Sequence, residues 1–429
     1  MISNDVMSVL ARLRARVAGE DLSARLKART DAPKRLRTRQ RTDRAGIERL
    51  LDELGALAPT AALRREIADD AALDRADVYA ANVENFVGTA KVPMGVMGPL
   101  RVNGTEASGD YMVPLATSEA ALVASYARGA QVVGAAGGVA AAVVSHGVLR
   151  TPAFVFDGLF EAGTFIDWVA THADDLRQAA EGTTRHGKLT LIEPYIEVDT
   201  VFLVCRYETG DAAGQNMVTV ATQALVDHVL AHTPVTPRHA FIEANFSGDK
   251  KASYLGMSRG RGRKVSASVT IPNTILRRHL RVEPEALAAY ARVAALGATM
   301  SGQLGAQAHY ANGLAALYIA TGQDAACVAE SAVGFTRMEP RPGLDGGPDG
   351  GATFFSVTMP NIIVGTVGGG TGLPGPRAAL EMMGLAGTGH AGAFSEIVAA
   401  TCLCGEISII AAIAAGHFTR AHQKLARHR

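Results

Sequence analysis

Cysteine is scarce in this sequence, with four residues in a chain of 429. Only Cys402 and Cys404 lie close together, and a single residue separates them. Neither a disulfide scaffold nor a zinc site has that pattern. We therefore expect no metal centre, and a reduced, cytoplasmic protein.

Long hydrophobic runs and an excess of one charge are also missing. The first 23 residues lack the unbroken apolar core of a signal peptide. The apolar run ISIIAAIAAGHF near the C-terminus is shorter than the roughly 20 residues that span a bilayer, so it predicts a buried helix. The net charge of +1 argues against a dedicated nucleic-acid binder. We expect neither a membrane nor a nucleic acid as partner.

The charge is unevenly distributed, because residues 12–49 are rich in arginine. Such a basic arm can bind an acidic surface. More often it is a solvated helical arm or a contact between subunits. The sequence leaves both interpretations open.

What the sequence does contain predicts a folded α+β protein. Apolar residues repeat at three- and four-residue steps over residues 1–80, which indicates an N-terminal helical region. Strand-like and helical pieces alternate as β-α-β-β-α-β over residues 152–242, which favours a small ferredoxin-like domain. We expect it to be inserted into a large mixed domain, formed by residues 81–151 and 243–429 around a long central helix. Thr117 and Ser118 predict a helix start that puts Glu119 in the first turn.

Candidate functional residues are weak signals when taken singly. The glycine-rich segment 365–371 is either a ligand loop or a plain turn. Segment 210–218 is either an anion site at a helix start or an ordinary connection. A lone glutamate at a helix start, an adjacent Asp–Lys pair or a histidine near the end of a chain is usually structural.

Taken together, the motifs are far more specific. The segments ENFVG, GVMGPL, PLATSEAALVAS, GDAAGQNM, DKK, HYAN, IATGQDAA, TMPNIIVGTVGGGT and GEISIIAAIAAGH occur in this order. They resemble the successive signature blocks of the hydroxymethylglutaryl-CoA reductases, over about residues 83–422. The likeness is greatest to the class found in eukaryotes and archaea.

The resemblance implies a role for four side chains. Glu119 would donate a proton, and Lys250 would stabilise the oxyanion at the reduced carbonyl. Asp324 would hold the lysine and tune the glutamate, and His417 would protonate the departing CoA thiolate. The chemistry needs such a set, because hydride addition to a thioester places negative charge on oxygen and the thiolate needs an acid. A second carboxylate close to Glu119 would raise its pKa enough for proton donation.

The resemblance also implies NADPH as cofactor and an acyl-CoA as substrate. Thr184 and Arg185 stand where the family binds the 2′-phosphate, and a guanidinium suits bidentate phosphate binding, so NADPH is favoured over NADH. Further cofactor contacts are expected from Asp211, Ala212, Gly214, Gln215, Asn216, Gly368, Gly369 and Gly370. Expected substrate contacts are Glu84 and Asn85 along the CoA channel, Arg128 at a CoA phosphate, Asn312 near the thioester, and Arg150, Asp249 and Lys251 around the acyl carboxylate.

Two departures from the family pattern concern the acyl group. Glu243 stands where a substrate-contacting serine is expected, and Val293 where a carboxylate-binding lysine is expected, although Arg292 is adjacent. The first hypothesis is reduction of hydroxymethylglutaryl-CoA to mevalonate with two NADPH. The alternatives are the same chemistry on a related acyl-CoA of a specialised pathway, or a non-catalytic CoA-binding homologue. The resemblance further implies a homodimer or homotetramer with the active site between subunits.

Overall fold

The computed structural model describes residues 11, 24, 27–29, 31, 43–341 and 350–416. The chain divides into two compact units, Met1–Lys91 and Val92–Arg429. Each unit is described by itself below. The predicted catalytic His417 lies outside the described residues.

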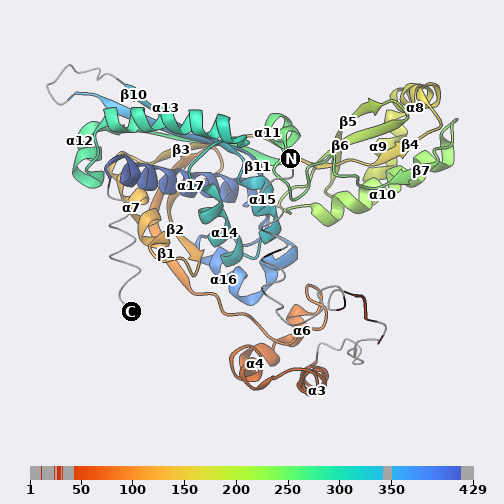
Figure 1. Ribbon diagram of the computed structural model, residues 1–429, viewed down its shortest axis with the longest axis horizontal. Helices are drawn as coiled ribbons and strands as arrows, with labels where there is room; N and C mark the ends of the chain where they lie inside the picture. Colours follow the sequence, from red (N-terminus) through yellow and green to blue (C-terminus); the bar gives the residue numbers. More distant parts are fainter. Residues whose placement is uncertain are drawn as a thin grey trace. The chain divides into compact units, whose positions relative to one another are not determined.

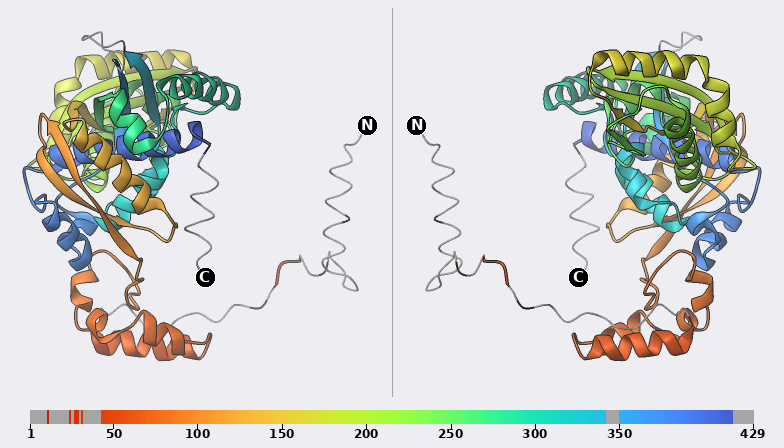
Figure 2. Two further views of the ribbon diagram at one scale, coloured as in Figure 1. Left: turned by 90° about the vertical axis from the view of Figure 1, so that its left-hand side faces the viewer. Right: turned by 90° about the vertical axis from the view of Figure 1, so that its right-hand side faces the viewer.

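The first unit is helical where it is described. Its helices are α3 (Arg44–Gly55), α4 (Ala61–Glu66), α5 (Asp70–Leu73) and α6 (Ala76–Tyr79), and Figure 2 shows them gathered in one group. The carboxylates of Asp43 and Asp69 cap the starts of α3 and α5 by accepting hydrogen bonds from the backbone N–H groups of Gly46 and Ala72. Ile47, Leu51 and Phe86 form part of a small buried cluster. Helices occur here as the sequence predicts, but turns divide residues 44–79 into four short helices, and most of the arginine-rich stretch lies outside the described residues.

The larger sheet of the second unit has the strand order β2-β1-β3-β8-β11-β10-β9. Neighbouring strands are antiparallel except β1 with β3 and β9 with β10. The strands are β1 (Met94–Gly104), β2 (Ser108–Ala116), β3 (Val139–Arg150), β8 (Gly262–Pro272), β9 (Gly305–Ala306), β10 (Gly334–Arg341) and β11 (Ala352–Ile362).

A long helix, α17 (Ala391–Ala414), packs against this sheet and against α7 (Leu122–Ala135) and α14 (Tyr310–Ala320) (Figure 1). Among the described residues it is the one helix long and apolar enough to cross a membrane, yet 83% of its apolar window is buried in the protein. It is therefore a core helix, as its apolar run predicts. The helix is longer than that run, because small residues and two buried glutamates, Glu396 and Glu406, continue it towards the N-terminus.

Small residues allow α7, α14 and α17 to pack closely around Tyr126. A Cβ atom at Gly129 of α7 would lie 2.0 Å from the carbonyl oxygen of Cys404 in α17. Gly313 of α14 and Gly405 of α17 both face the ring of Tyr126, with no room for a side chain. Hydrophobic contact and the absence of side chains therefore set the spacing of the three helices.

A second, smaller sheet has the order β7-β4-β6-β5, with all pairs antiparallel. Its strands are β4 (Ala153–Val155), β5 (Lys188–Glu197), β6 (Thr200–Glu208) and β7 (His239–Phe241). The end of β3 also pairs with β6, which joins the two sheets. The helices α8 (Leu159–Thr171), α9 (Ala173–Glu181) and α10 (Gln215–His232) occur between its strands along the chain.

The fold is thus mixed α and β, as the sequence predicts. The expected domain boundaries stay predictions, since both sheets belong to one compact unit. The remaining helices are α11 (Tyr254–Arg259), α12 (Asn273–Ile275), the π-helical η1 (Leu276–Leu280), α13 (Pro284–Ser301), the 3-10 helices η2 (Ala325–Cys327) and η3 (Gly369–Gly372), α15 (Val328–Ser331) and α16 (Pro374–Met382).

Candidate active site

Lys250 and Asp324 form an ion pair, with 2.7 Å between Nζ and Oδ2. The hydrogen bond that Lys250 donates to Asp324 is the main reason that the pKa of Lys250 is raised above its usual value. Burial raises the pKa of Asp324, but the hydrogen bond and charge of Lys250 together with the backbone N–H of Ala326 outweigh it, and the pKa falls below the usual range. The pair is therefore a fixed ammonium beside an ionised carboxylate.

Glu119 lies in a loop ahead of α7, so the prediction that it belongs to the first turn of the helix is wrong. The helix begins at Leu122, because Ala121 has the left-handed φ of 70° that interrupts the helical backbone. Thr117 Oγ1 accepts a hydrogen bond from the Glu119 backbone N–H. The side-chain amide of Asn312 lies 3.1 Å from both carboxylate oxygens of Glu119. Glutamate and asparagine are thus brought together across distant parts of the sequence.

These two pairs lie at opposite ends of α14. Asn312 is in its first turn, the helix ends at Ala320, and Asp324 follows in the next loop. The helix rises about 12 Å from Asn312 to Ala320. No hydrogen bond or ion pair connects Glu119 with Asp324 or Lys250 in the part of the chain that the structure describes. The expected closeness of Glu119 and Asp324 therefore stays a prediction.

The glycine-rich loops converge next to the Asp324 loop. Gln323 bonds both the N–H and the carbonyl of Gly365, at 2.9 and 3.0 Å. A Cβ atom at Gly370 would lie 2.5 Å from the carbonyl oxygen of Gly322. Ala212 forms an isolated bridge with Val367. The fold thus joins three predicted blocks, two for the cofactor and one for Asp324.

The start of α10 is suited to an anionic group. Its N-cap is Gly214, with φ of 80° and no capping side chain, so the first N–H groups of Gln215 and Asn216 have no intrahelical partner. Thr184 touches the same turn through Met217, and Arg185 beside it is exposed. At Gly368 and Gly369 a side chain would meet open space, and both have positive φ. These residues fit a dinucleotide phosphate.

Asp211 differs from its neighbours, because its carboxylate is already occupied. The oxygens accept hydrogen bonds from the backbone N–H groups of Gly389 and Ala391. Burial raises the pKa of Asp211, but these two donors, the charge of Arg263 and the backbone N–H of His390 together lower it below the usual range. In the structure it clamps the cofactor loop to the loop before α17.

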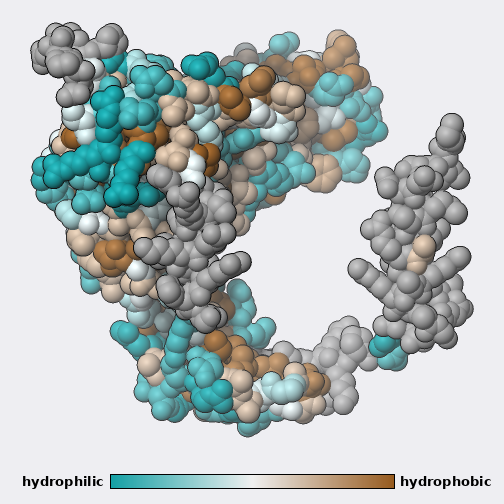
Figure 3. Space-filling model, turned by 60° about the vertical axis from the view of Figure 1, so that its left-hand side comes forward, coloured by the Kyte–Doolittle hydropathy of each residue, from teal (hydrophilic) through white to brown (hydrophobic). Residues whose placement is uncertain are grey.

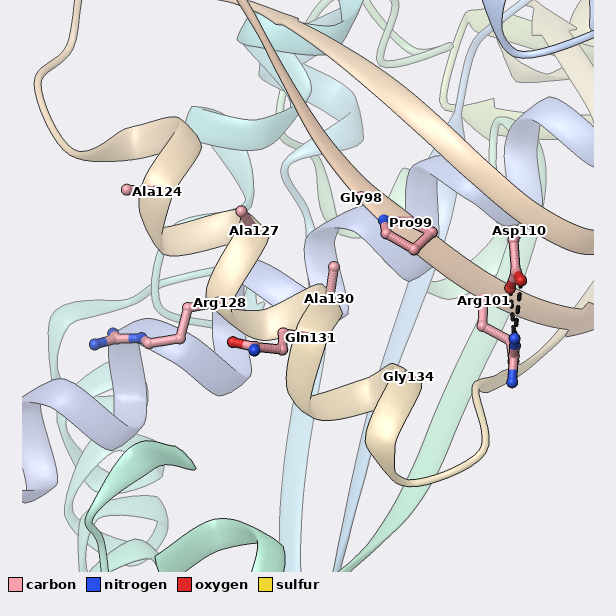
Figure 4. Close-up of a pocket in the computed structure, with 10 residues that line it drawn as sticks. All are labelled: Gly98, Pro99, Arg101, Asp110, Ala124, Ala127, Arg128, Ala130, Gln131 and Gly134. Carbon is pink, nitrogen blue, oxygen red and sulfur yellow. Dashed lines mark hydrogen bonds and ion pairs between the residues drawn. The ribbon is translucent and has the colours of Figure 1, made fainter. Parts of the chain in front are cut away.

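A cavity of about 750 Å³ lies between α7 and β1 (Figure 4). Its lining includes Gly98, Pro99, Ala127, Arg128 and Gln131. Figure 4 shows Arg128 directed away from β1, and its guanidinium donates to the hydroxyl and carbonyl oxygens of Ser408 in α17. A second cavity of about 400 Å³ contains Glu119 and shares Ala124 with the first. Both cavities lie along α7, one beside Glu119 and the other beside Arg128.

Arg150 is 8% exposed at its side chain and faces two carboxylates. Nη1 lies 3.1 Å from Asp249 Oδ2 and 3.4 Å from Glu243 Oε2. Arg150 Nε and Glu243 Oε1 are buried without a hydrogen-bond partner. Lys251 Nζ donates to the carbonyl of Asp249. The predicted acyl-carboxylate contacts therefore lie together, and Glu243 lies among them.

The other residues predicted to contact or to affect the acyl-CoA are exposed. Glu84 and Asn85 belong to the first unit, in the exposed segment after α6. Arg292 and Val293 are exposed on α13. The cysteines are free and buried.

Sequence reasoning missed three buried polar residues that organise the site. Arg261 and Glu330 form an ion pair beneath Lys250, and Arg263 donates to the carbonyls of Gly210 and Val364, at the two loops predicted to bind the cofactor. Burial lowers the pKa of Arg263 to about 10. All three residues are buried. In the sequence they look like ordinary surface charges, and no local signal marks them as buried.

Comparison with known proteins decides the family. Residues 51–427 match the family model described as hydroxymethylglutaryl-coenzyme A reductase. A protein of Methanothermobacter thermautotrophicus named 3-hydroxy-3-methylglutaryl-coenzyme A reductase is 39% identical over 371 residues, which cover 86% of this chain and 91% of its own. The chain belongs to the hydroxymethylglutaryl-CoA reductase family.

Further relatives carry the same name. The protein of Halobacterium salinarum is 41% identical, over 80% of this chain and 84% of its own. That of Strongylocentrotus purpuratus is 36% identical, over 82% of this chain and 38% of its own. A solved class II reductase from Streptococcus pneumoniae, bound to NADPH in open conformations, has a TM-score of 0.61 at 20% identity, over 85% of this chain and 96% of its own. This structural likeness supports the fold.

Proposed function

We propose that the protein reduces 3-hydroxy-3-methylglutaryl-CoA to mevalonate and CoA with two NADPH and two protons. The carrying observation is the Lys250–Asp324 pair, set against the two loops that fit a dinucleotide. NADPH supplies the hydride for each of two successive reductions. Family membership, shown by relatives of the same name, supports the reaction.

In this proposal, Lys250 keeps its proton at neutral pH and stabilises the negative oxygen formed as the thioester carbonyl is reduced. The thiohemiacetal then releases CoA as a thiolate, and the aldehyde accepts the second hydride. Glu119 donates the proton to the new alkoxide, and Asn312 orients its carboxyl group. Protonation of the thiolate by His417 is part of the proposal.

For the cofactor, we propose that Thr184 and Arg185 bind the 2′-phosphate at the start of α10. The strand order β7-β4-β6-β5 supports a ferredoxin-like nucleotide domain. Arg185→Ala should raise the KM for NADPH about tenfold, with the KM for NADH unchanged, because a charge-assisted contact is lost. Arg177→Ala on α9 is the control, since Arg177 pairs with Asp174 at the surface. Equal effects on both cofactors would contradict the assignment.

For the substrate, we propose that the acyl-CoA lies along α7. One cavity contains Glu119 and the neighbouring one contains Arg128, and Arg128 is placed to contact a CoA phosphate after leaving Ser408. The decisive test is NADPH oxidation with hydroxymethylglutaryl-CoA beside a panel of other acyl-CoA thioesters. Mevalonate as product supports the reaction, and no turnover of any thioester contradicts it.

Glu243 favours a second candidate, the same reduction of a related acyl-CoA. Arg150 is already shared by two carboxylates, so a third from hydroxymethylglutaryl-CoA would meet repulsion. Under this candidate, another thioester is the best substrate, and Glu243→Ser shifts the preference towards hydroxymethylglutaryl-CoA. A wild-type protein that prefers hydroxymethylglutaryl-CoA excludes it. Retention of the Lys250–Asp324 pair argues against a non-catalytic homologue.

We also propose a homo-oligomer with the active site between subunits. One chain holds Glu119 and Lys250 at opposite ends of α14, so a two-fold partner would bring the missing half to each site. On α13, Val293, Leu296 and Met300 are 60–80% exposed at helical spacing, which suits a contact between copies. Figure 3 shows several apolar patches on one face of the molecule.

Mixing two inactive variants tests this arrangement. Co-refolded Glu119→Gln and Lys250→Met chains should regain turnover, because a mixed dimer contains one site with both native side chains. The control is either variant refolded alone. Absence of recovery in a verified mixed dimer would contradict a shared site.

The class within the family is a finer proposal. The relatives at 36–41% identity named above are archaeal and sea-urchin proteins, and the class II structure is 20% identical. These values support the class of eukaryotes and archaea. A cytoplasmic location is likewise proposed, from the reduced cysteines that the chain keeps buried.

A further inference from the structure

A buried ion pair lies directly beneath Lys250. Arg261 and Glu330 are each 1% exposed at their side chains, and their charged groups touch. Taking two charges out of water is costly, and a buried pair is often no more stabilising than apolar residues of the same volume. Stability alone therefore gives a weak reason for charges at this place.

The contacts of the pair point to the reacting lysine. Glu330 Oε1 accepts a hydrogen bond from the backbone N–H of Lys250, at 3.3 Å. Arg261 Nη2 lies 2.9 Å from Asp249 Oδ1, on the residue before Lys250. The pair thus contacts the backbone N–H of Lys250 through Glu330 and the side chain of the preceding residue, Asp249, through the charge of Arg261.

Lys250 needs such support because of its backbone conformation. Its φ is +56°, in the left-handed region that residues with a side chain seldom adopt. A residue persists there only when its surroundings hold it. If the backbone relaxed, Nζ would leave Asp324 and the point where the oxyanion forms.

The same guanidinium reaches the cofactor side. Arg261 Nη2 also lies 2.8 Å from Oε1 of Gln215, the first residue of α10. The other end of that amide, Gln215 Nε2, contacts Cys327 Sγ at 3.2 Å, in the segment that follows Asp324. One buried side chain therefore connects the lysine loop, the start of the cofactor helix and the Asp324 segment.

We infer that Arg261, together with Glu330, is a positioning residue that holds Lys250 in its reactive geometry and fixes it relative to the start of α10. This inference rests on the proposed function. Neither residue touches the reacting atoms. Their effect on turnover passes through the position of the lysine.

The test compares substitutions of the pair with one of another buried glutamate. Arg261→Met removes the guanidinium and with it the contacts to Glu330, Asp249 and Gln215. Arg261→Lys keeps the charge but replaces a planar fork with a single ammonium, which cannot reach Glu330, Asp249 and Gln215 together. Glu330→Gln is close in shape and guards against failure to fold. Glu396→Gln is the matched control, because Glu396 is also fully buried and binds the backbone N–H groups of Glu106 and Ala107, away from Lys250.

Two quantities are measured in each folded variant. The first is kcat and KM with the best thioester of the wild-type panel. We expect kcat to fall about 100-fold in Arg261→Met, as for a small misplacement of a catalytic group. It should fall about tenfold in Arg261→Lys and Glu330→Gln, with KM for the acyl-CoA within about twofold. Glu396→Gln should keep kcat even where it loses stability.

The second quantity is independent of activity. Acylation of Lys250 by an amine reagent is followed by peptide mass spectrometry. Lys188 in β5 of the smaller sheet is the internal reference, since it also forms an ion pair, with Glu181 of α9. Release from Asp324 should speed labelling of Lys250 in Arg261→Met but not in Glu396→Gln. Unchanged kcat and labelling in the Arg261 variants, or an equal loss of kcat in Glu396→Gln, would overturn the inference. A wild-type protein that reduces no thioester refutes the proposed function instead, while the labelling comparison still reports on the positioning of Lys250.

Discussion

The two ends of α14 hold their functional side chains in different ways. At one end, Lys250 pairs with Asp324, and buried charges of Arg261 and Glu330 brace the backbone beneath it. At the other end, Glu119 is exposed in a loop, and among the described residues its carboxylate is bonded by Asn312 alone. The lysine is organised within one chain. The glutamate is left open for substrate or a second subunit.

This difference separates two tasks of a reductase. An oxyanion is best stabilised by a charge that needs no rearrangement when the transition state forms. A proton donor must meet an intermediate that arrives later and has to exchange protons with solvent between turnovers. Both side chains are exposed, but Lys250 is paired with a carboxylate and Glu119 is bonded only by an amide, which suits these tasks. Substitutions at one end should therefore leave the other end in place.

The largest effect is expected from Glu119→Gln. Loss of a general acid should lower kcat by about 10² to 10⁴, while cofactor binding at the other end stays unchanged. Steady-state NADPH oxidation and NADPH fluorescence titration measure the two quantities. Asn312→Ala should cost less, about tenfold, because the carboxyl group survives. Wild-type turnover in Glu119→Gln would remove the glutamate from the mechanism.

Lys250→Met should lower kcat by about 10² to 10³, the usual loss for an oxyanion donor. Asp324→Asn sharpens this prediction, because Asp324 is the main cause of the raised pKa of Lys250. Lys250 should stay protonated, and the enzyme active, to higher pH in the wild type than in Asp324→Asn. The alkaline limb of kcat should therefore move to lower pH in the variant. An unmoved limb would show that the limb reports another group.

Gly129→Ala disturbs the glutamate end through packing. Its methyl group would meet the carbonyl of Cys404 and push α7, which follows Glu119, away from α17. Overpacking of this kind costs about 1–3 kcal/mol in unfolding free energy. Gly134→Ala, on the same helix with no atom within 4 Å, is the control and should be neutral or slightly stabilising. Urea unfolding of both variants decides whether the close approach matters.

The smallest effect is expected from His146 in β3, whose ring lies next to Thr209, just before the predicted cofactor loop at residues 210–218. Burial, and then Arg263 and Arg206, lower the pKa of His146 to about 4. The unfolded chain binds this proton near pH 6.5, so the folded state loses stability as pH falls from 6.5 towards 4. In His146→Asn, the unfolding free energy should therefore fall by about 1 kcal/mol less than in the wild type between pH 6 and pH 5. Unfolding free energies at several pH values measure it, and parallel curves for both proteins would contradict it.

The sequence alone determined the local structure and the family. Apolar periodicity predicts helices such as α3 and the buried α17, and positive-φ turns follow the glycines of the cofactor loops. The signature blocks in order identified the family, which the relatives confirm. These features are readable because each depends on residues within a few positions of one another.

Tertiary structure alone decided how the functional residues are grouped. Glu119 was expected inside a helix, yet Ala121 in the left-handed region leaves it in a loop beside Asn312. The roles of Arg261 and Glu330 could not be found from the sequence, because the type of a charged residue does not show whether it is buried or solvated. Their partners lie far away along the chain, and only its folding back places them beneath Lys250. Local patterns set the elements, whereas contacts between distant residues set the distances on which catalysis depends.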